Sequence, residues 1–321
     1  MSKTKGVEMT DILIMGETLV EIMRNREGVE LYDEGLFRGP FPSGAPAICA
    51  SAAARLGSRV ALISGVGNDD FGKCILDRMR ELKVDTSHVV INDTVSTGCA
   101  FVTYFSDGSR KFLFHMGNTP AVEAKAPGKD DFSGVKYMHI MGCSLMAKKE
   151  FADEILKTMH IYGENGAKIS FDPNIRTELK GNGDLDRILE EVLQSTSIFL
   201  PGREELLTFT GQKDVESAVN KCFSYPKMEI VLMKDGSRGS TLFRKGEEPL
   251  SCPVYKVKQA DATGAGDCFD GAFLAGLVQG LPLDRAVKNA SAAGALNAAA
   301  FGPMEGDISP ETVEKMISQG N

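Results

Sequence analysis

The residues best suited to chemistry lie at 261–269, in the sequence DATGAGDCF, where two glycines precede an aspartate. Gly264 and Gly266 allow a tight backbone turn and leave its amides open. Apolar residues recur at helical spacing from Phe269 onward, so the turn opens a helix whose first N–H groups form an anion site. A carboxylate at Asp267 beside that site suits a base that takes a proton from a hydroxyl attacking a phosphoryl group. A plain helix cap would produce a similar turn, and the pattern alone leaves both interpretations open.

The elements that must position this segment are short apolar runs alternating with helical segments. We predict strands at residues 11–16, 59–64, 137–141, 168–172, 197–200 and 229–233, and helices at residues 44–56, 70–82, 148–165, 267–279 and 283–300. Such alternation predicts an α/β fold with a doubly wound, mostly parallel sheet. Ligands bind such sheets at the carboxyl ends of the strands. The residues expected at those ends are Gly16, Asp172, Pro201 and Asp235.

Two segments break the alternation. Residues 17–38 follow the first strand with no clear helix, and residues 97–118 alternate in polarity around the turn SDGS at 106–109. A turn between strand-like runs predicts a hairpin. We expect both segments to form a small antiparallel sheet that projects as a lid from a single domain of residues 10–318 and excludes water. Residues 1–9 are expected to be a loose extension.

Composition excludes several classes of function. The 321 residues carry a net charge of -8, which disfavours nucleic acid and anionic membranes as partners. No apolar run reaches the length of about 18 residues that a membrane span needs, and the start of the chain has no secretory signal. Seven cysteines contain no C-x-x-C pair and four histidines are dispersed, so no zinc site is predicted. We expect a cytoplasmic protein.

The string DATGAGD at 261–267 resembles the C-terminal signature of the PfkB, or ribokinase-like, carbohydrate kinase family. The resemblance continues in order along almost the whole chain, with PSGAPA at 42–47, GVGNDDFG at 65–72, FDPNIR at 171–176 and KDGSRG at 234–239. The segment at 171–176 is similar to the version in fructokinases and 2-keto-3-deoxygluconate kinases. The resemblance implies a ribokinase-like fold and an enzyme that uses ATP and Mg²⁺ to phosphorylate a small-molecule sugar or sugar acid.

It also implies roles for the matched positions. Asp267 is the expected base, and the anion hole is expected from the backbone amides of Gly264, Ala265, Gly266 and Asp267. The residues expected near ATP are Lys234, Gly236, Gly239 and Thr263, with Asn297 close to the adenine. Those expected at the substrate are Glu21, Gly44, Ala45, Tyr104 and Arg176. Asp261 and Thr263 match a monovalent-cation site of many members, and whether this chain needs potassium stays open.

Three positions depart from the family pattern. Ser43 and Ile48 stand where a glycine and an asparagine are usual near the sugar, and losing that amide puts ordinary ribose or fructose selectivity in question. Gly202 replaces the asparagine of an Asn-x-x-Glu segment that keeps Glu205. Magnesium is then expected to be held mainly through ATP phosphates and water, with Glu205 acting indirectly.

The substrate remains open between several sugars. Glu21 and residues 42–47 favour a ketohexose such as fructose or tagatose, which we rank first. The acid 2-keto-3-deoxygluconate ranks second, because it would suit Arg176 and the basic residues of the lid, Arg24, Arg26, Arg38, Arg110 and Lys111. A sugar phosphate, a nucleoside and a non-catalytic sugar sensor are further alternatives. Lid strands often pair between subunits, so we expect a homodimer through the lid.

Overall fold

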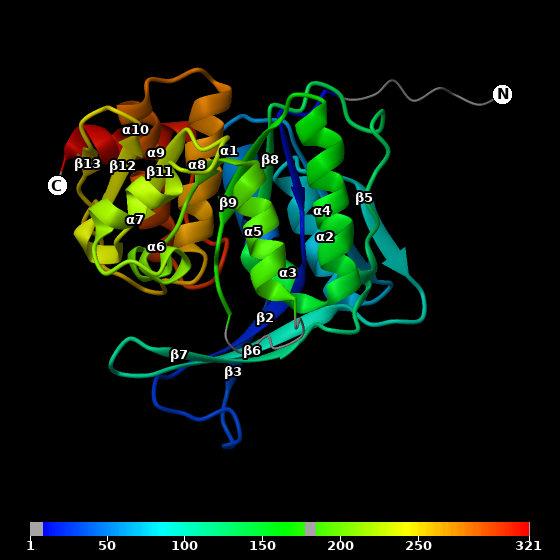
Figure 1. The fold of residues 1–321 in the computed structure, drawn as a ribbon. Coiled ribbons are helices and arrows are strands. Elements are labelled where there is room, and N and C mark those ends of the chain that lie inside the picture. The colour runs from blue at the N-terminus through cyan, green and yellow to red at the C-terminus, as the bar shows by residue number, and fades with distance from the viewer. Residues whose placement is uncertain (1–8, 177–183, 321) are drawn as a thin grey trace.

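The computed structural model describes residues 9–176 and 184–320 and contains two sheets (Figure 1). The strands of the larger sheet are β1 (Ile12–Met15), β4 (Val60–Gly67), β5 (Asp85–Asn92), β8 (Tyr137–Met141), β9 (Lys168–Asp172), β10 (Thr196–Phe199), β11 (Ile230–Lys234), β12 (Ser240–Arg244) and β13 (Leu250–Cys252). They are ordered β13-β12-β11-β10-β9-β8-β1-β4-β5. Every neighbouring pair from β11 to β5 is parallel, and β12 and β13 join antiparallel. The predicted mostly parallel sheet is confirmed.

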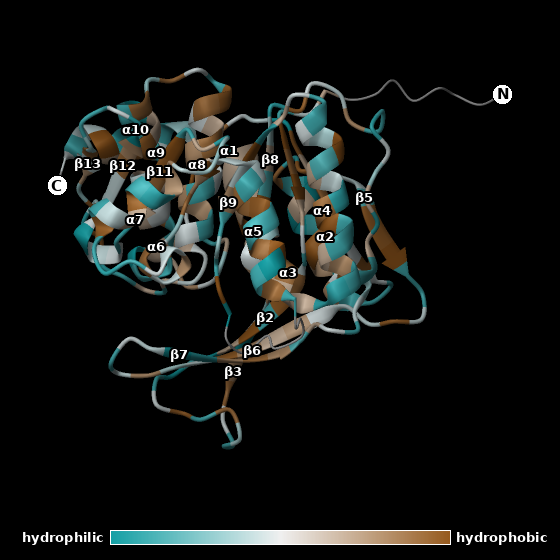
Figure 2. Cartoon of the chain, viewed as in Figure 1, coloured by the Kyte–Doolittle hydropathy of each residue, from teal (hydrophilic) through white to brown (hydrophobic). Residues whose placement is uncertain are grey.

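Helices cover both faces of this sheet. One face carries α1 (Ala45–Arg55), α2 (Asp70–Glu81), α8 (Ala265–Val278), α9 (Leu283–Ala298) and α10 (Pro310–Gln319). The other carries α3 (Gly142–Ala147), α4 (Lys149–Glu164), α5 (Leu185–Ser195), α6 (Arg203–Thr210) and α7 (Val215–Cys222). Figure 2 shows hydrophilic residues on the outward side of α4 and α5, as expected of helices that pack one face on a sheet. Within the described ranges, no helix combines the length and apolarity needed to cross a membrane.

The first strand shows why the sheet is buried on both sides. All four residues of β1 are fully buried. Ile12 and Ile14 join the apolar cluster beneath α1 and α8, whereas Leu13 and Met15 join the cluster beneath α4 and α5. Because successive side chains point to opposite faces, a strand covered on both faces needs a continuous apolar run.

The lid is a separate sheet of four strands, β2 (Leu19–Arg24), β3 (Phe37–Ser43), β6 (Gly98–Tyr104) and β7 (Arg110–His115), in the order β3-β2-β6-β7. The expectation of a purely antiparallel lid is wrong, because β2 pairs with β6 in parallel. These strands follow β1 and β5, which run in the same direction, so both enter the lid with the same orientation. The lid also reaches Ser43, five residues beyond its predicted boundary at 38.

The N-terminal prediction falls largely outside the described residues. Of the predicted extension at 1–9, only Met9 is described, and it forms an isolated bridge with Ser133. Single-turn 3-10 helices occupy two loops of the domain, at Pro120–Glu123 and Gly236–Arg238.

Candidate active site

A cavity of about 220 Å³ lies between the carboxyl ends of the main strands and the lid, somewhat below the roughly 300–1,000 Å³ that is typical of ligand pockets. It brings together ten of the residues predicted from the sequence: Glu21, Gly44, Ala45, Arg176, Glu205, Lys234, Thr263, Gly264, Gly266 and Asp267. Their elements are distant in the chain and meet only because parallel strands end at the same edge. Ala265, the first residue of α8, adjoins this wall.

The glycine turn opens α8 as predicted. Gly264 is the N-cap with φ of 75°, and no side chain caps the helix. The first-turn amides of α8 therefore have no side-chain oxygen bound to them and can receive an anion. The helix begins at Ala265, two residues before its predicted start. A plain side-chain cap, the alternative interpretation of the pattern, is absent from this turn.

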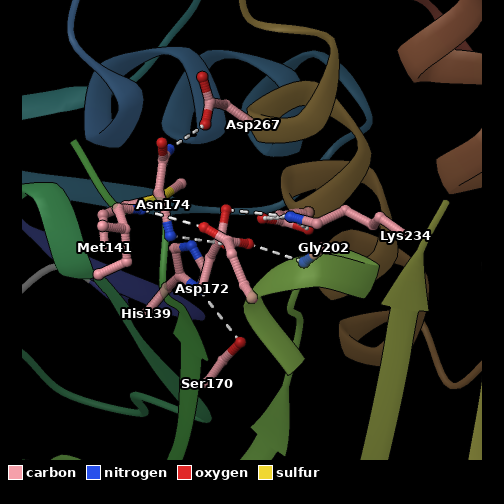
Figure 3. Close-up of polar contacts among 11 residues, drawn as sticks. His139, Met141, Ser170, Asp172, Asn174, Gly202, Lys234 and Asp267 are labelled. Atoms are coloured by element: carbon pink, nitrogen blue, oxygen red, sulfur yellow. Dashed lines mark hydrogen bonds and ion pairs between the residues drawn. The ribbon is translucent and has the colours of Figure 1, made fainter. Parts of the chain in front are cut away.

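Asp267 sits in the first turn of α8 and is only 6% exposed. Asn174, two residues beyond the end of β9, donates from Nδ2 to its Oδ1 at 2.9 Å (Figure 3). Burial raises the pKa of Asp267 to about 7, and the neighbouring carboxylate of Asp172 adds to the rise, while Arg176 and Lys234 oppose it. A carboxyl group with a pKa near neutrality can take up and release a proton under physiological conditions.

Asp261 fixes the loop that carries the glycines. Its Oδ1 accepts from the backbone N–H and the hydroxyl of Thr263, at 2.9 and 2.8 Å. Its Oδ2 accepts from the Tyr104 hydroxyl at 3.2 Å and from the Gly302 N–H at 3.1 Å. These bonds tie the lid strand β6 to the loop. Because a carboxylate has about four acceptor positions, a monovalent cation at Asp261 would have to displace one of these donors, and this site stays a prediction.

The lid end of the cavity contains the buried carboxyl group of Glu21. Glu21 accepts from the Ser43 hydroxyl at Oε1, at 2.7 Å, and its Oε2 has no hydrogen-bond partner among the described residues. Burial raises the pKa of Glu21 to about 7. Ser43, one of the departures from the family pattern, thus supports Glu21, a residue predicted to lie at the substrate. Tyr104 does not line the cavity and contacts the loop at Asp261 instead.

Glu17 is a cavity residue that sequence reasoning missed. It accepts from the Cys143 thiol at 3.2 Å and from the Ser144 hydroxyl, and burial raises its pKa. Its position directly after Gly16, at the end of the first predicted strand, was the available signal. Asn174 was missed as the partner of Asp267, although it lies inside the FDPNIR segment.

Two arginines line the cavity, Arg110 from the lid and Arg176 from the loop after β9. Their guanidinium carbons lie 5.8 and 5.6 Å from the ring centroid of Phe112. Arg110 also donates to the Thr263 hydroxyl at 3.0 Å, which links the lid to the loop before α8.

Three of the other lid cations have local partners. Arg24 is 1% exposed, donates to the carbonyls of Glu30 and Asp33, and does not line the cavity. Arg38 stacks over Phe301, with 4.1 Å to the ring centroid. Lys111 pairs with Glu30 at 2.9 Å. Arg26 lies on the surface of the lid.

Glu205 closes the turn before α6. Its Oε2 accepts from the Gly202 N–H at 2.8 Å and its Oε1 from the Ile175 N–H at 3.0 Å. Within the described part of the chain, no group of three acidic, histidine or cysteine side chains could enclose a metal ion. Both oxygens of Glu205 thus accept backbone N–H groups, and the expected indirect role of Glu205 in holding magnesium through water stays a prediction.

Three of the residues predicted to lie near the nucleotide are outside the cavity wall. Gly236 and Gly239 lie at the turn after β11 and outside the cavity wall. Asn297 is fully buried, and its amide binds the carbonyls of Thr263 and Pro303 and the N–H of Gly306. These backbone bonds use the Asn297 amide to support the loop before α8, and its approach to the adenine stays a prediction.

The chain is similar to known proteins in both sequence and structure. A family model described as pfkB family carbohydrate kinase matches residues 9–310. Fructokinase-1 of Oryza sativa subsp. japonica is 32% identical over 298 residues, covering 89% of this chain and 91% of that protein. Fructokinase-1 of Zea mays is 31% identical over 271 residues, covering 84% and 83%. The structure of a candidate ribokinase II from E. coli in complex with ATP and Mg²⁺ is 34% identical, with a TM-score of 0.90 and coverage of 97% and 100%.

Proposed function

The chain belongs to the pfkB family of carbohydrate kinases and is a sugar kinase, and from this we propose that it transfers the γ-phosphoryl group of ATP to a hydroxyl of a ketohexose, with Asp267 as the general base. The observation that supports this best is the position of Asp267 on the cavity wall, in the first turn of a helix that has no side-chain cap. Asn174 holds Oδ1, and among the described residues no hydrogen bond occupies Oδ2.

The reaction follows from these positions. The sugar hydroxyl oxygen attacks the γ-phosphorus while its proton passes to the Asp267 carboxylate. The bond from the γ-phosphorus to the bridging oxygen breaks, and ADP leaves with that electron pair. The amides of Gly264 to Asp267 donate hydrogen bonds to the phosphoryl oxygens as charge develops on them. Lid closure over the cavity excludes water, which limits wasteful hydrolysis of ATP.

Magnesium would accompany ATP and neutralise the charge of its phosphates. Glu205 is the residue placed to hold it through water, since both of its oxygens already accept backbone N–H groups. The oxygens of Glu205 face the turn before α6 and the loop after β9, on the same cavity wall as the glycine turn.

A ketohexose is supported by the free acceptor at Glu21 Oε2, which a sugar hydroxyl can fill. The relatives from rice and maize are named fructokinases. A sugar acid such as 2-keto-3-deoxygluconate is the second candidate, because Arg110 and Arg176 both line the cavity and a guanidinium binds a carboxylate well.

The test is an ADP-release assay with Mg·ATP, with and without potassium, over ketoses, aldoses, sugar acids, sugar phosphates and nucleosides. We expect the highest kcat/KM on a ketohexose. A higher value on a sugar acid, lost selectively on replacing Arg176 by methionine, would transfer the proposal to the second candidate. Binding of sugars without turnover of any of them would contradict a kinase and favour a sensor.

Activity is expected to depend on pH through Asp267. The protonated carboxyl cannot accept the hydroxyl proton, and its pKa is about 7, so kcat/KM should fall as the pH drops below 7 and level off above it. The measurement is kcat/KM for the sugar between pH 5.5 and 9. Glu21 has a similar pKa, and Glu21→Gln is the matched control: a profile that loses its step in this variant would assign the titration to Glu21.

We also propose a homodimer through the lid. Leu36 is 71% exposed and Leu113 is 48% exposed, and Tyr32 is an exposed aromatic residue in the loop between β2 and β3. β3 and β7 are the edge strands of the lid, and exposed apolar edges favour pairing with a second copy. Light scattering after size exclusion is expected to give twice the chain mass. The double variant Leu36→Glu, Leu113→Glu is expected to be monomeric, and an unchanged mass would exclude this surface.

A further inference from the structure

The end of β11 brings a buried ammonium into the cavity. Lys234 Nζ lies 3.0 Å from Asp172 Oδ2, and 3.1 and 2.9 Å from Oδ1 and Oδ2 of Asp270 (Figure 3 labels the first two residues). Asp270 is fully buried and Asp172 is 3% exposed. Replacing such a buried ion cluster by apolar side chains often leaves stability unchanged or improves it. Stability alone is therefore a weak explanation for the presence of this buried ion cluster.

The cluster lies beside the glycine turn. A methyl group added at Gly266 would have Nζ of Lys234 as its nearest neighbour, at 3.9 Å. Asp270 is one helical turn after Asp267 on α8, and Asp172 is two residues before Asn174. The segment at the end of β9 therefore contacts α8 in two places. Asn174 binds the proposed base Asp267 directly, and Asp172 is linked to Asp270 through Lys234.

An ammonium has three N–H donors. Among the described residues, Asp172 and Asp270 are the hydrogen-bond partners of Lys234. Lys234 Nζ contacts three carboxyl oxygens, and two of these belong to Asp270. When one N–H is shared between the two oxygens of Asp270, the third N–H can donate to a group in the cavity, because Lys234 is on the cavity wall. Gly202, which stands where related kinases usually carry an asparagine, lines the same cavity and contributes no side chain.

The two carboxyl groups of the cluster differ in their pKa. Burial, together with the Asp172 carboxylate, raises the pKa of Asp270 well above its usual value. Burial also acts to raise the pKa of Asp172, but the Lys234 ammonium outweighs it and the pKa is lowered. The ammonium stays protonated, because the two carboxyl groups outweigh the effect of burial on its pKa.

We propose that Lys234 is a catalytic residue whose third N–H binds the phosphoryl group in transfer, and that Asp270 is a positioning residue that fixes this ammonium together with Asp172. The inference rests on the proposed kinase function and deepens it. Charge spreads over the equatorial oxygens of the phosphoryl group in the transition state, where a fixed cation in a water-poor site is most effective. Lys234 keeps its proton throughout, and the hydroxyl proton still passes to Asp267.

Three variants test the roles in the ADP-release assay. Lys234→Ala should lower kcat about a hundred- to a thousandfold, the loss typical of a preorganised donor at a reacting centre, with the sugar KM little changed. Asp270→Leu should cause a similar loss. Asp270→Asn should retain most activity, because its amide oxygen can accept from Lys234 while its NH₂ donates to Asp172. Lys288→Ala is the matched control, since Lys288 is an exposed lysine of α9 paired with Asp284 at 3.4 Å.

Two further readouts separate catalysis from folding. Ethylammonium should restore part of the activity of Lys234→Ala, whereas tetramethylammonium, which has no N–H, should not. ADP with aluminium fluoride imitates the phosphoryl group in transfer and needs no known acceptor; wild type should bind it more tightly than ADP alone, and Lys234→Ala and Asp270→Leu should lose this preference.

The inference is overturned if both variants keep the preference for the mimic, or if they lower only thermal stability and keep wild-type kcat per folded molecule. A wild-type enzyme that phosphorylates no compound but shows the lysine-dependent preference would contradict the proposed substrate class and support the role of Lys234. If Asp267→Asn stays active while Lys234→Ala loses activity, the result contradicts the role of Asp267 as base and supports the role of Lys234.

Discussion

Asp267→Asn is expected to lower kcat about a thousandfold or more, within the range of 10²–10⁴ for losing general base catalysis, while the sugar KM changes only a few-fold. Asparagine keeps the size of the side chain and its hydrogen bond with Asn174, after rotation of one amide, but cannot accept the hydroxyl proton. The loss should therefore appear in the chemical step, and binding should be largely retained.

The measurement is steady-state ADP release with each variant, combined with calorimetry of sugar and ATP binding. Asp284→Asn is the control, because Asp284 is an exposed acid in the first turn of α9 and Asp267 is an acid in the first turn of α8. Wild-type kcat in Asp267→Asn would remove Asp267 from the mechanism. A raised KM with unchanged kcat would instead make it a substrate-binding group.

The main sheet was predictable because most of its strands follow from local patterns. β1, β4, β8, β9, β10 and β11 are apolar runs bounded by glycine or polar residues, and covered parallel strands leave this signal in the sequence. β5 escaped prediction because its sequence, DTSHVVIN, mixes polar and apolar residues, and it lies partly exposed at the sheet edge. The short antiparallel strands β12 and β13 have similarly weak patterns.

Site residues were predictable where the signal was local. The glycine turn and Asp267 share one segment, so spacing alone assembles them. The contact between Lys234 and Asp270 spans 36 residues and depends on β11 ending opposite α8. Nothing near Asp270 distinguishes it from a polar residue on a helix, and it was not singled out. Asn297 shows the converse case, because its position on a helix does not reveal that its amide binds three backbone groups.

The glycine turn itself leads to the second large effect. Gly264→Ala is expected to lower kcat about a hundred- to a thousandfold, the range for removing a preorganised anion-hole donor. Gly264 has φ of 75°, where L residues are strained. The added methyl group would lie 2.4 Å from the Pro303 carbonyl oxygen and 3.1 Å from Ile48 Cγ2. The loop has to shift to relieve both contacts, and the amides of the first turn shift with it.

Gly280→Ala separates displacement of the anion hole from backbone strain. Gly280 follows α8 at its other end with φ of 70°, and a methyl group there meets no atom within 4 Å. The strain should lower its free energy of unfolding by about 1 kcal/mol without changing kcat. If Gly264→Ala lowers the melting temperature as Gly280→Ala does but keeps its kcat, the amides of this turn do not bind the phosphoryl group. A loss of kcat in Gly264→Ala alone, with weaker binding of ADP–aluminium fluoride, would assign them that role, because both variants carry the same backbone strain and only one moves the anion site.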